Sequence, residues 1–183
     1  MGNKFAAFNS SGLITAFYDD VDSPAPAGAT TIEITEDEWM ACLSNPGYTV
    51  VNGSLLPPSA ASLLAQAQAA QAATLSSAYQ AAVQVDVSYT SAGGVTKTFQ
   101  ASSNSQSTLL VATTGYNLAG ETPAGFYWVA ADNTQVPFTL VDLKGLYAVM
   151  LAQGNAAFNK LQSLKSEVRA ATTVAAVQAV VWQ

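Results

Sequence analysis

The side chains of this sequence that could do chemistry are mainly carboxylates, and the densest group of them is Asp19, Asp20 and Asp22. Closely spaced oxygen ligands are typical of loops that bind hard cations such as Ca²⁺. The sequence lacks the glycine and the glutamate that occupy the sixth and twelfth positions of an EF-hand loop. The three acids therefore indicate a solvated acidic loop ahead of Pro24, with adventitious Ca²⁺ binding as the alternative, and no metal site is expected.

Pairs of carboxylates could also serve as acid and base in glycoside hydrolysis. The acids beyond residue 40 are Asp86, Glu121, Asp132, Asp142 and Glu167. Asp142 has the capping-box spacing from Thr139, Asp132 lies in a turn sequence and Glu167 lies in a helical pattern, so no catalytic pair stands out. The sequence has no histidine and one cysteine, Cys42, which removes the commonest general base and any histidine-activated thiol. We expect a protein that is not an enzyme and that carries no cofactor.

Acidic side chains gather at the start of the chain. Residues 1–40 contain seven acids and a single base, Lys4, whereas the rest contains five acids and five bases, so the net charge of −6 lies entirely in that segment. An acidic surface repels phosphate backbones, and no basic cluster offsets it. Nucleic-acid binding is therefore not expected. Membrane insertion is not expected either, because the apolar segments are rich in Gln, Ser and Pro or are too short to span a bilayer.

Alternating and turn-forming residues predict a small α+β module over residues 1–57. Residues 4–8 and 13–18 are expected strands of a hairpin, and residues 31–34 are an expected third strand. Thr35 and Glu38 have the spacing of a capping box, which predicts a helix through residue 43. Asn52 and Gly53 predict a second tight hairpin, which joins residues 48–51 to residues 54–56.

Residues 58–84 form an Ala-, Gln- and Ser-rich segment without any charged residue. Ala and Gln favour helix, so this segment is expected to be a linking helix. Leu64 and Leu75 fall on one seam of that helix, together with Gln68 and Gln71. Two interpretations remain open, namely a linker that lies on the protein surface and a stalk that associates with other copies of the chain.

Residues 85–183 predict a C-terminal α+β domain with two hairpins, a helix over residues 103–113, a long amphipathic helix and a last short helix over residues 174–182. The long helix begins at Leu140, and Gly154 implies a bend or the close approach of another helix. Its apolar residues recur at spacings of three and four over about four heptads. The candidate self-association residues on this seam are Leu143, Tyr147, Met150, Leu161, Leu164 and Val168. Packing within the chain is the alternative explanation of the same pattern.

The three tryptophans are the strongest candidates for contacts with a partner, because an indole combines apolar area with one N–H donor. Trp39 lies on the short helix of the acidic module, Trp128 on a strand of the last hairpin, and Trp182 near the end of the sequence. Core packing is the alternative role for each ring. A host glycan is an alternative ligand to a protein.

Two segments resemble the tail-fibre assembly proteins of tailed phages. Residues 14–43 contain an aromatic strand that ends at Tyr18, a loop with Pro and Gly, and an I-x-I-T-x-x-x-W junction from Ile32 to Trp39. Residues 99–143, followed by a long Ala-rich helix, resemble the C-terminal domain of unknown function that is common in that family. The residues that carry this second resemblance are Phe99, Ser105, Leu109, Trp128, Asp132, Asn133, Val136, Thr139 and Leu143.

The resemblance implies a non-enzymatic chaperone that binds the tip of a tail fibre and promotes its trimerisation in the host cytoplasm, in some phages remaining on the virion tail. The residues expected to contact the phage tail-fibre protein are Tyr18, Trp39, Trp128, Asp132 and Asn133. A second copy of the chain is a further expected partner. The alternative function is a structural virion protein, such as an attachment subunit of the tail fibre or baseplate.

Overall fold

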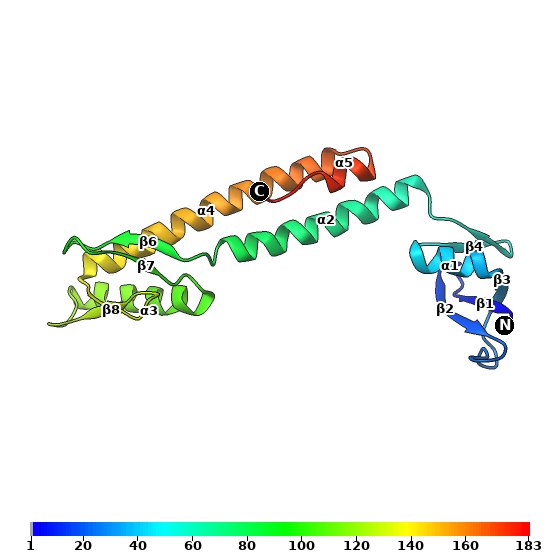
Figure 1. Ribbon diagram of the computed structural model, residues 1–183, viewed down its shortest axis with the longest axis horizontal. Coiled ribbons are helices and arrows are strands. Elements are labelled where there is room, and N and C mark those ends of the chain that lie inside the picture. Colours follow the sequence, from blue (N-terminus) through cyan, green and yellow to red (C-terminus); the bar gives the residue numbers. More distant parts are fainter. Residues whose placement is uncertain (1) are drawn as a thin grey trace. The chain divides into compact units, whose positions relative to one another are not determined.

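The protein has an α+β fold, described by a computed structural model over residues 2–183 (Figure 1). The chain forms two compact units, Met1–Ala67 and Gln68–Gln183. The sequence instead suggested three parts, with boundaries after residues 57 and 84. The unit boundary lies inside helix α2 (Ala60–Ala82), at Gln68, whose side chain bonds to the end of the long helix α4 (Leu140–Ala170).

The first unit contains a three-stranded antiparallel sheet of β1 (Lys4–Phe8), β2 (Ile14–Asp19) and β3 (Thr31–Ile34), with β1 in the centre. Helix α1 (Glu36–Ser44) follows β3 directly. The capping box predicted for its start is present, with Thr35 and Glu38 bonding each other's backbone amides.

A short hairpin of β4 (Thr49–Val51) and β5 (Ser54–Leu56) follows α1. Its turn residues Asn52 and Gly53 have φ angles of 51° and 76°, the left-handed conformation that a two-residue hairpin turn requires. The hairpin predicted at this dipeptide is therefore confirmed. The core of the first unit is small, with Ala6, Ala7, Ile34, Cys42 and Val50 buried.

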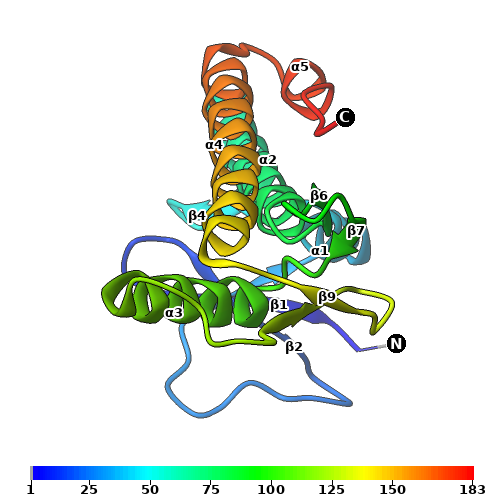
Figure 2. The ribbon, with the colours of Figure 1, turned by 90° about the vertical axis from the view of Figure 1, so that its left-hand side faces the viewer.

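The second unit pairs hairpins with helices. Its elements after α2 are β6 (Val87–Thr90), β7 (Thr96–Phe99), α3 (Ser103–Ala119), β8 (Tyr127–Val129), β9 (Gln135–Pro137), α4 and α5 (Val174–Gln178). The strands form two separate two-stranded hairpins, β6–β7 and β8–β9. Helix α3 lies across the beginning of α4 (Figure 2).

Aromatic and aliphatic side chains from these elements form the core of the second unit. Phe99 and Leu109 are completely buried, and the Phe99 ring lies 5.3 Å from that of Phe138. The Tyr89 ring packs edge-on against Phe138 at 5.9 Å and lies directly over Gly145 of α4. A Cβ atom at Gly145 would approach two carbons of that ring to 2.8 Å, so the core requires glycine at this helical position.

The start of α4 is tied to the β6–β7 hairpin through Asp142. The predicted capping box is present, since the Asp142 carboxylate accepts hydrogen bonds from the Thr139 amide and hydroxyl at 2.8 and 2.6 Å. The same carboxylate accepts the amide of Ala92 at 2.6 Å, although its side chain is only 1% exposed. Burial raises the pKa of Asp142, but the hydrogen bonds from Thr139, Ala92 and Tyr89 outweigh it and hold that pKa below the ordinary value. Asp142 therefore stays ionised and joins two elements as well as capping one.

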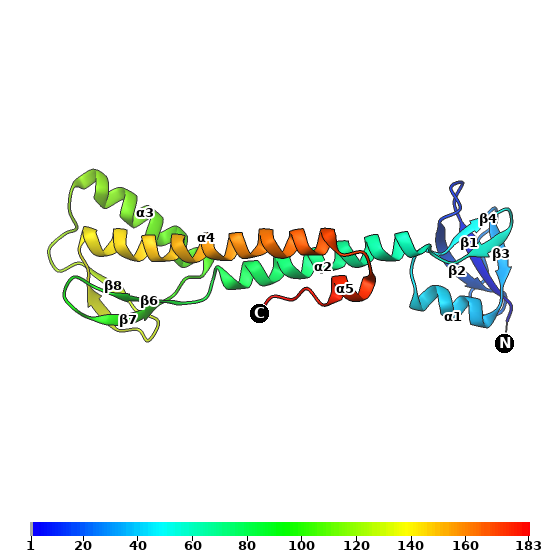
Figure 3. The ribbon, with the colours of Figure 1, turned by 90° about the horizontal axis from the view of Figure 1, so that it is seen from above.

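Helices α2 and α4 run side by side in opposite directions from Gln68 onward (Figure 3). Gln68 of α2 donates its side-chain amide to the carbonyls of Val168 and Ala171 at the C-terminal end of α4, at 3.2 and 3.1 Å. Gln153 of α4 donates in the same way to the carbonyls of Ala82, the last residue of α2, and of Val85, three residues beyond it. Each helix thereby donates a side-chain amide to carbonyls at or just beyond the C-terminal end of the other.

The expected self-association seam lies largely inside a single chain. Leu75, Leu143, Met150, Leu161 and Val168 are all buried in the second unit, so they pack its helices against one another. The remaining seam residues are partly exposed, namely Leu64, Tyr147 and Leu164. Of the two explanations that the pattern allowed, packing within the chain accounts for the five buried residues. No helix in the described part of the chain combines the length and apolarity that crossing a membrane requires.

Candidate binding surface

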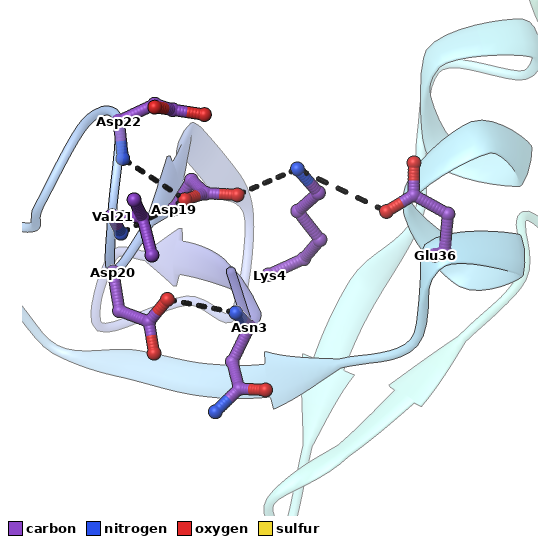
Figure 4. A network of polar contacts seen from close by, with 7 residues as sticks. All are labelled: Asn3, Lys4, Asp19, Asp20, Val21, Asp22 and Glu36. Carbon is purple, nitrogen blue, oxygen red and sulfur yellow. Dashed lines mark hydrogen bonds and ion pairs between the residues drawn. The ribbon is translucent and has the colours of Figure 1, made fainter. Parts of the chain in front are cut away.

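The acidic loop uses its carboxylates to hold the first unit together. Asp19 forms an ion pair with Lys4 at 2.6 Å and accepts the amides of Val21 and Asp22 at 2.9 and 3.0 Å, while Asp20 accepts the amide of Asn3 (Figure 4). The expectation of a solvated loop is therefore wrong for Asp19, which is buried, and the Lys4 pair is what the sequence pattern missed.

The hydrogen bond from Lys4 and the two backbone amides lower the pKa of Asp19 to about 2. All three groups donate hydrogen bonds to the Asp19 carboxylate and therefore favour its ionised form. Among residues 2–183, no group of three or more Cys, Asp or Glu side chains is placed to hold a metal ion.

The two candidate partner residues of the first unit lie on different elements. Tyr18 is on the edge strand β2, opposite Phe5 of β1, and is partly exposed. Trp39 is on α1, where the ammonium group of Lys4 lies 4.8 Å from the centre of its ring. Within the described residues the two rings make no aromatic contact with each other. The structure therefore does not gather them into one site.

The other three candidates come together on the β8–β9 hairpin. Trp128 of β8 is opposite Val136 of β9, and its ring packs 6.4 Å from that of Phe126 at the edge of the core. Asp132 forms an ion pair of 2.7 Å with Lys97 of β7, and hydrogen bonds from Lys97 and Thr134 keep its pKa below the ordinary value.

Asn133 has a φ of 63° and supplies the left-handed residue of the hairpin turn. The pair Asp132 and Asn133 thus shapes the turn and ties it to the neighbouring hairpin. Trp128 is the one member of the three that lines an open hollow.

That hollow has a volume of about 330 Å³ and lies between the hairpin and α3. Tyr127, Trp128 and Val129 form its apolar side, and Gln100, Asn104, Ser105 and Thr108 form its polar side. A second hollow of about 450 Å³ shares Thr108 and continues along α3. It is lined by Ser107, Thr108, Val111, Ala112, Tyr116 and Phe126. We refer to the surface of these two hollows as the hairpin–α3 face.

The hairpin–α3 face combines exposed apolar area with uncommitted amides. Tyr127 is 46% exposed and Val111 is 73% exposed, and no charged side chain lines either hollow. The side-chain amides of Gln100 and Asn104 form no hydrogen bond with the described residues, so their donors and acceptors are available to a ligand. Such a surface can bind a partner through apolar contact and neutral hydrogen bonds.

Most of this face was not singled out from the sequence. Trp128 was identified, but its neighbours Tyr127 and Val129 were not. The alternation itself carried the missing signal, because a core-directed Trp128 places both neighbours on the outer side of the strand. Asn104 and Thr108 are four residues apart on α3, a spacing that puts them on one face of a helix.

Residues 66–181 match the family model described as Domain of unknown function (DUF4376). The chain belongs to the DUF4376 family. The matched segment nearly coincides with the second compact unit, Gln68–Gln183, so the DUF4376 domain includes the α2–α4 pair, both hairpins and the hairpin–α3 face. Neither a curated protein nor a solved structure matches the chain.

Proposed function

We propose that this DUF4376 protein is a non-enzymatic phage tail-fibre assembly chaperone, which binds the tip of the fibre and promotes its trimerisation. The observation that carries the proposal is the hairpin–α3 face of the DUF4376 domain, an uncharged surface with exposed aromatic and aliphatic side chains. The resemblance of the strand-to-helix junction from Ile32 to Trp39 to tail-fibre assembly proteins gives the second line of support.

The chemistry of this face suits a fibre chain that has not yet trimerised. Such a chain exposes apolar side chains together with unpaired backbone amides and carbonyls at its strand edges, which invite mispairing. Tyr127 and Val111 offer apolar area, and the amides of Gln100 and Asn104 can pair with backbone groups of either polarity. Covering both kinds of group at once would keep single fibre chains from pairing wrongly until three have met.

In this proposal the protein acts in the host cytoplasm during assembly and in some phages stays on the virion tail. Its acidic first unit makes nucleic acid an unfavourable partner, since the seven acids of residues 1–40 would repel a phosphate backbone. The fibre protein is the expected partner, bound mainly through the DUF4376 domain.

Co-expression with the fibre protein encoded next to it tests the proposal. The full chain should raise the yield of soluble fibre trimer, and Tyr127→Asp should lower that yield, because it places a charge in the uncharged face. Val141→Asp adds the same charge at a residue that is 69% exposed on α4 and lines neither hollow, so it should leave the yield unchanged.

A trimer yield that does not respond to the wild-type chain would exclude the chaperone function. Quantitative proteomics of purified virions separates the alternative function. A fixed ratio to the fibre protein in virions, without any effect on trimer yield, would favour the structural attachment subunit.

A further inference from the structure

A hollow of about 640 Å³ lies on the other side of α3, where the ends of α2 and α3 meet the middle of α4. Its lining includes Tyr79, Leu110, Leu151, Gly154 and Phe158, and contains no charged residue. Leu110, Leu151 and Phe158 are 45%, 55% and 48% exposed, which is unusual for three large apolar side chains around one hollow. We refer to it as the α3–α4 groove.

Gly154, which lines this groove, makes room for no group of its own chain. It stands near the middle of the 31-residue helix α4, where glycine lowers helix stability by about 1 kcal/mol relative to alanine. A Cβ atom at Gly154 would meet no atom within 4 Å, in contrast to Gly145, whose missing side chain makes room for Tyr89. Of the two explanations that the sequence allowed, a bend or the close approach of another helix, the close approach is therefore absent within the chain, and the space above Gly154 is open to a group from outside.

We propose that two copies of the chain associate through their α3–α4 grooves, with the Phe158 ring of each copy seated over Gly154 of the other. Gly154 and Phe158 are four residues apart, one turn of the same helix, and both line the groove. Two α4 helices that cross in opposite directions about a twofold axis between these positions place each Phe158 opposite the other chain's Gly154. The groove thus contains both the projection and the recess of a self-complementary twofold contact.

The charges of the chain also favour a second copy as the occupant. Residues 68–183 contain five acids and five bases, so two DUF4376 domains approach each other without net repulsion. The first unit has seven acids and one base, and two copies of it repel each other. The association is therefore expected between DUF4376 domains. It does not depend on the proposed function, because the groove and the hairpin–α3 face share only Ser107.

Sedimentation velocity of the full chain over a dilution series tests the inference. The wild-type chain should form a dimer that dissociates on dilution, and Phe158→Asp should weaken its association about tenfold or more, because it brings a charge into an apolar contact. Val141→Asp is the matched control on the same helix, outside the groove, and should leave association unchanged.

Gly154→Ala gives a second test, whose expected pair of results would not arise from misfolding. The added methyl group occupies the recess, so association should weaken, while the melting temperature of the dilute monomer should rise because alanine favours the helix. Circular dichroism confirms that each variant is folded.

A wild-type chain that stays monomeric at every concentration would overturn the inference. So would a dimer that Phe158→Asp and Gly154→Ala leave intact, or one that Val141→Asp weakens equally. A monomer whose groove variants lose only fibre binding would also overturn it, since the groove would then belong to the fibre partner.

Discussion

Replacing Gly145 by alanine tests whether the Tyr89 ring fixes the packing of the β6–β7 hairpin on α4. A Cβ atom there would lie 2.8 Å from two carbons of the ring, well inside van der Waals contact. The ring cannot retreat freely, because it packs edge-on against Phe99 at 6.5 Å and Phe138 at 5.9 Å and its hydroxyl reaches Asp142.

The expected magnitude follows from two opposing effects. Extra volume in a packed core costs about 1–3 kcal/mol, whereas exchanging glycine for alanine in a helix gains about 1 kcal/mol. Gly145→Ala should therefore lower the free energy of unfolding by up to about 2 kcal/mol. Gly115→Ala on α3 is the matched control, because a Cβ atom there meets nothing within 4 Å and only the gain of about 0.5–1 kcal/mol remains.

Urea denaturation followed by circular dichroism measures both variants against the wild type. The double variant with Tyr89→Ala adds a stricter test, since the methyl group at Gly145 should cost nothing once the ring is removed. A coupling energy of about 1 kcal/mol or more is expected between the two substitutions. Equal stabilities of Gly145→Ala and Gly115→Ala, or a coupling near zero, would refute the packing argument.

Three further predictions concern polar groups. In Lys4→Met, the pKa of Asp19 should rise from about 2 toward its ordinary 3.8, as read from carboxyl NMR shifts, and an unchanged pKa would contradict the ion pair. Because the pKa of Asp19 is lower in the folded state, the stability that Asp19 contributes is complete above pH 3.8 and is lost as the pH falls toward 2. Asp142→Asn should destabilise the second unit by about 1–3 kcal/mol in urea at neutral pH, because asparagine keeps only one of the two acceptor oxygens and turns an NH2 group toward either the Thr139 amide or the Ala92 amide. Since the pKa of Asp142 is also lowered, that deficit should shrink as the pH falls below 3.8, and a constant deficit would argue against an ionised carboxylate. Gln153→Leu should cost about 0.5–1.5 kcal/mol by removing the side-chain donor to the carbonyls of Ala82 and Val85, whereas Gln162→Leu, exposed on the same helix, should cost little, and equal effects would exclude this role.

The sequence predicted helix starts and tight turns well where a few neighbouring residues determine the backbone conformation. The capping boxes at Thr35 and Thr139 and the turn at Asn52 and Gly53 all form as expected, because each depends on neighbours in the sequence. Helix α3 shows the limit of such signals. It was expected to end near residue 113, yet it continues to a left-handed cap at Gly120, with the Tyr116 ring packed 5.0 Å from that of Phe126.

The sequence pattern did not predict the polar contacts between residues far apart in the chain. Gln68 was placed on a helix seam that fitted either a surface linker or a self-associating stalk, but its amide reaches carbonyls about a hundred residues away, at the end of α4. Asp142 was identified as a cap, whereas its bond to Ala92 depends on the hairpin packing over the helix. The hairpin–α3 face likewise depends on how α3 crosses the second unit, which no local spacing specifies.

The hydrogen bonds that glutamine side chains make between α2 and α4 bear on how the DUF4376 domain responds to pH and salt. Gln68 and Gln153 carry no charge, so they neither titrate nor attract counterions, and screening by salt leaves their hydrogen bonds largely unaffected. Lys4 and Asp19 hold the first unit by an ion pair whose strength depends on both acidity and ionic strength. The hydrogen bonds that join α2 to α4 should therefore persist in acid and at high salt, whereas the Lys4–Asp19 ion pair of the first unit weakens in acid.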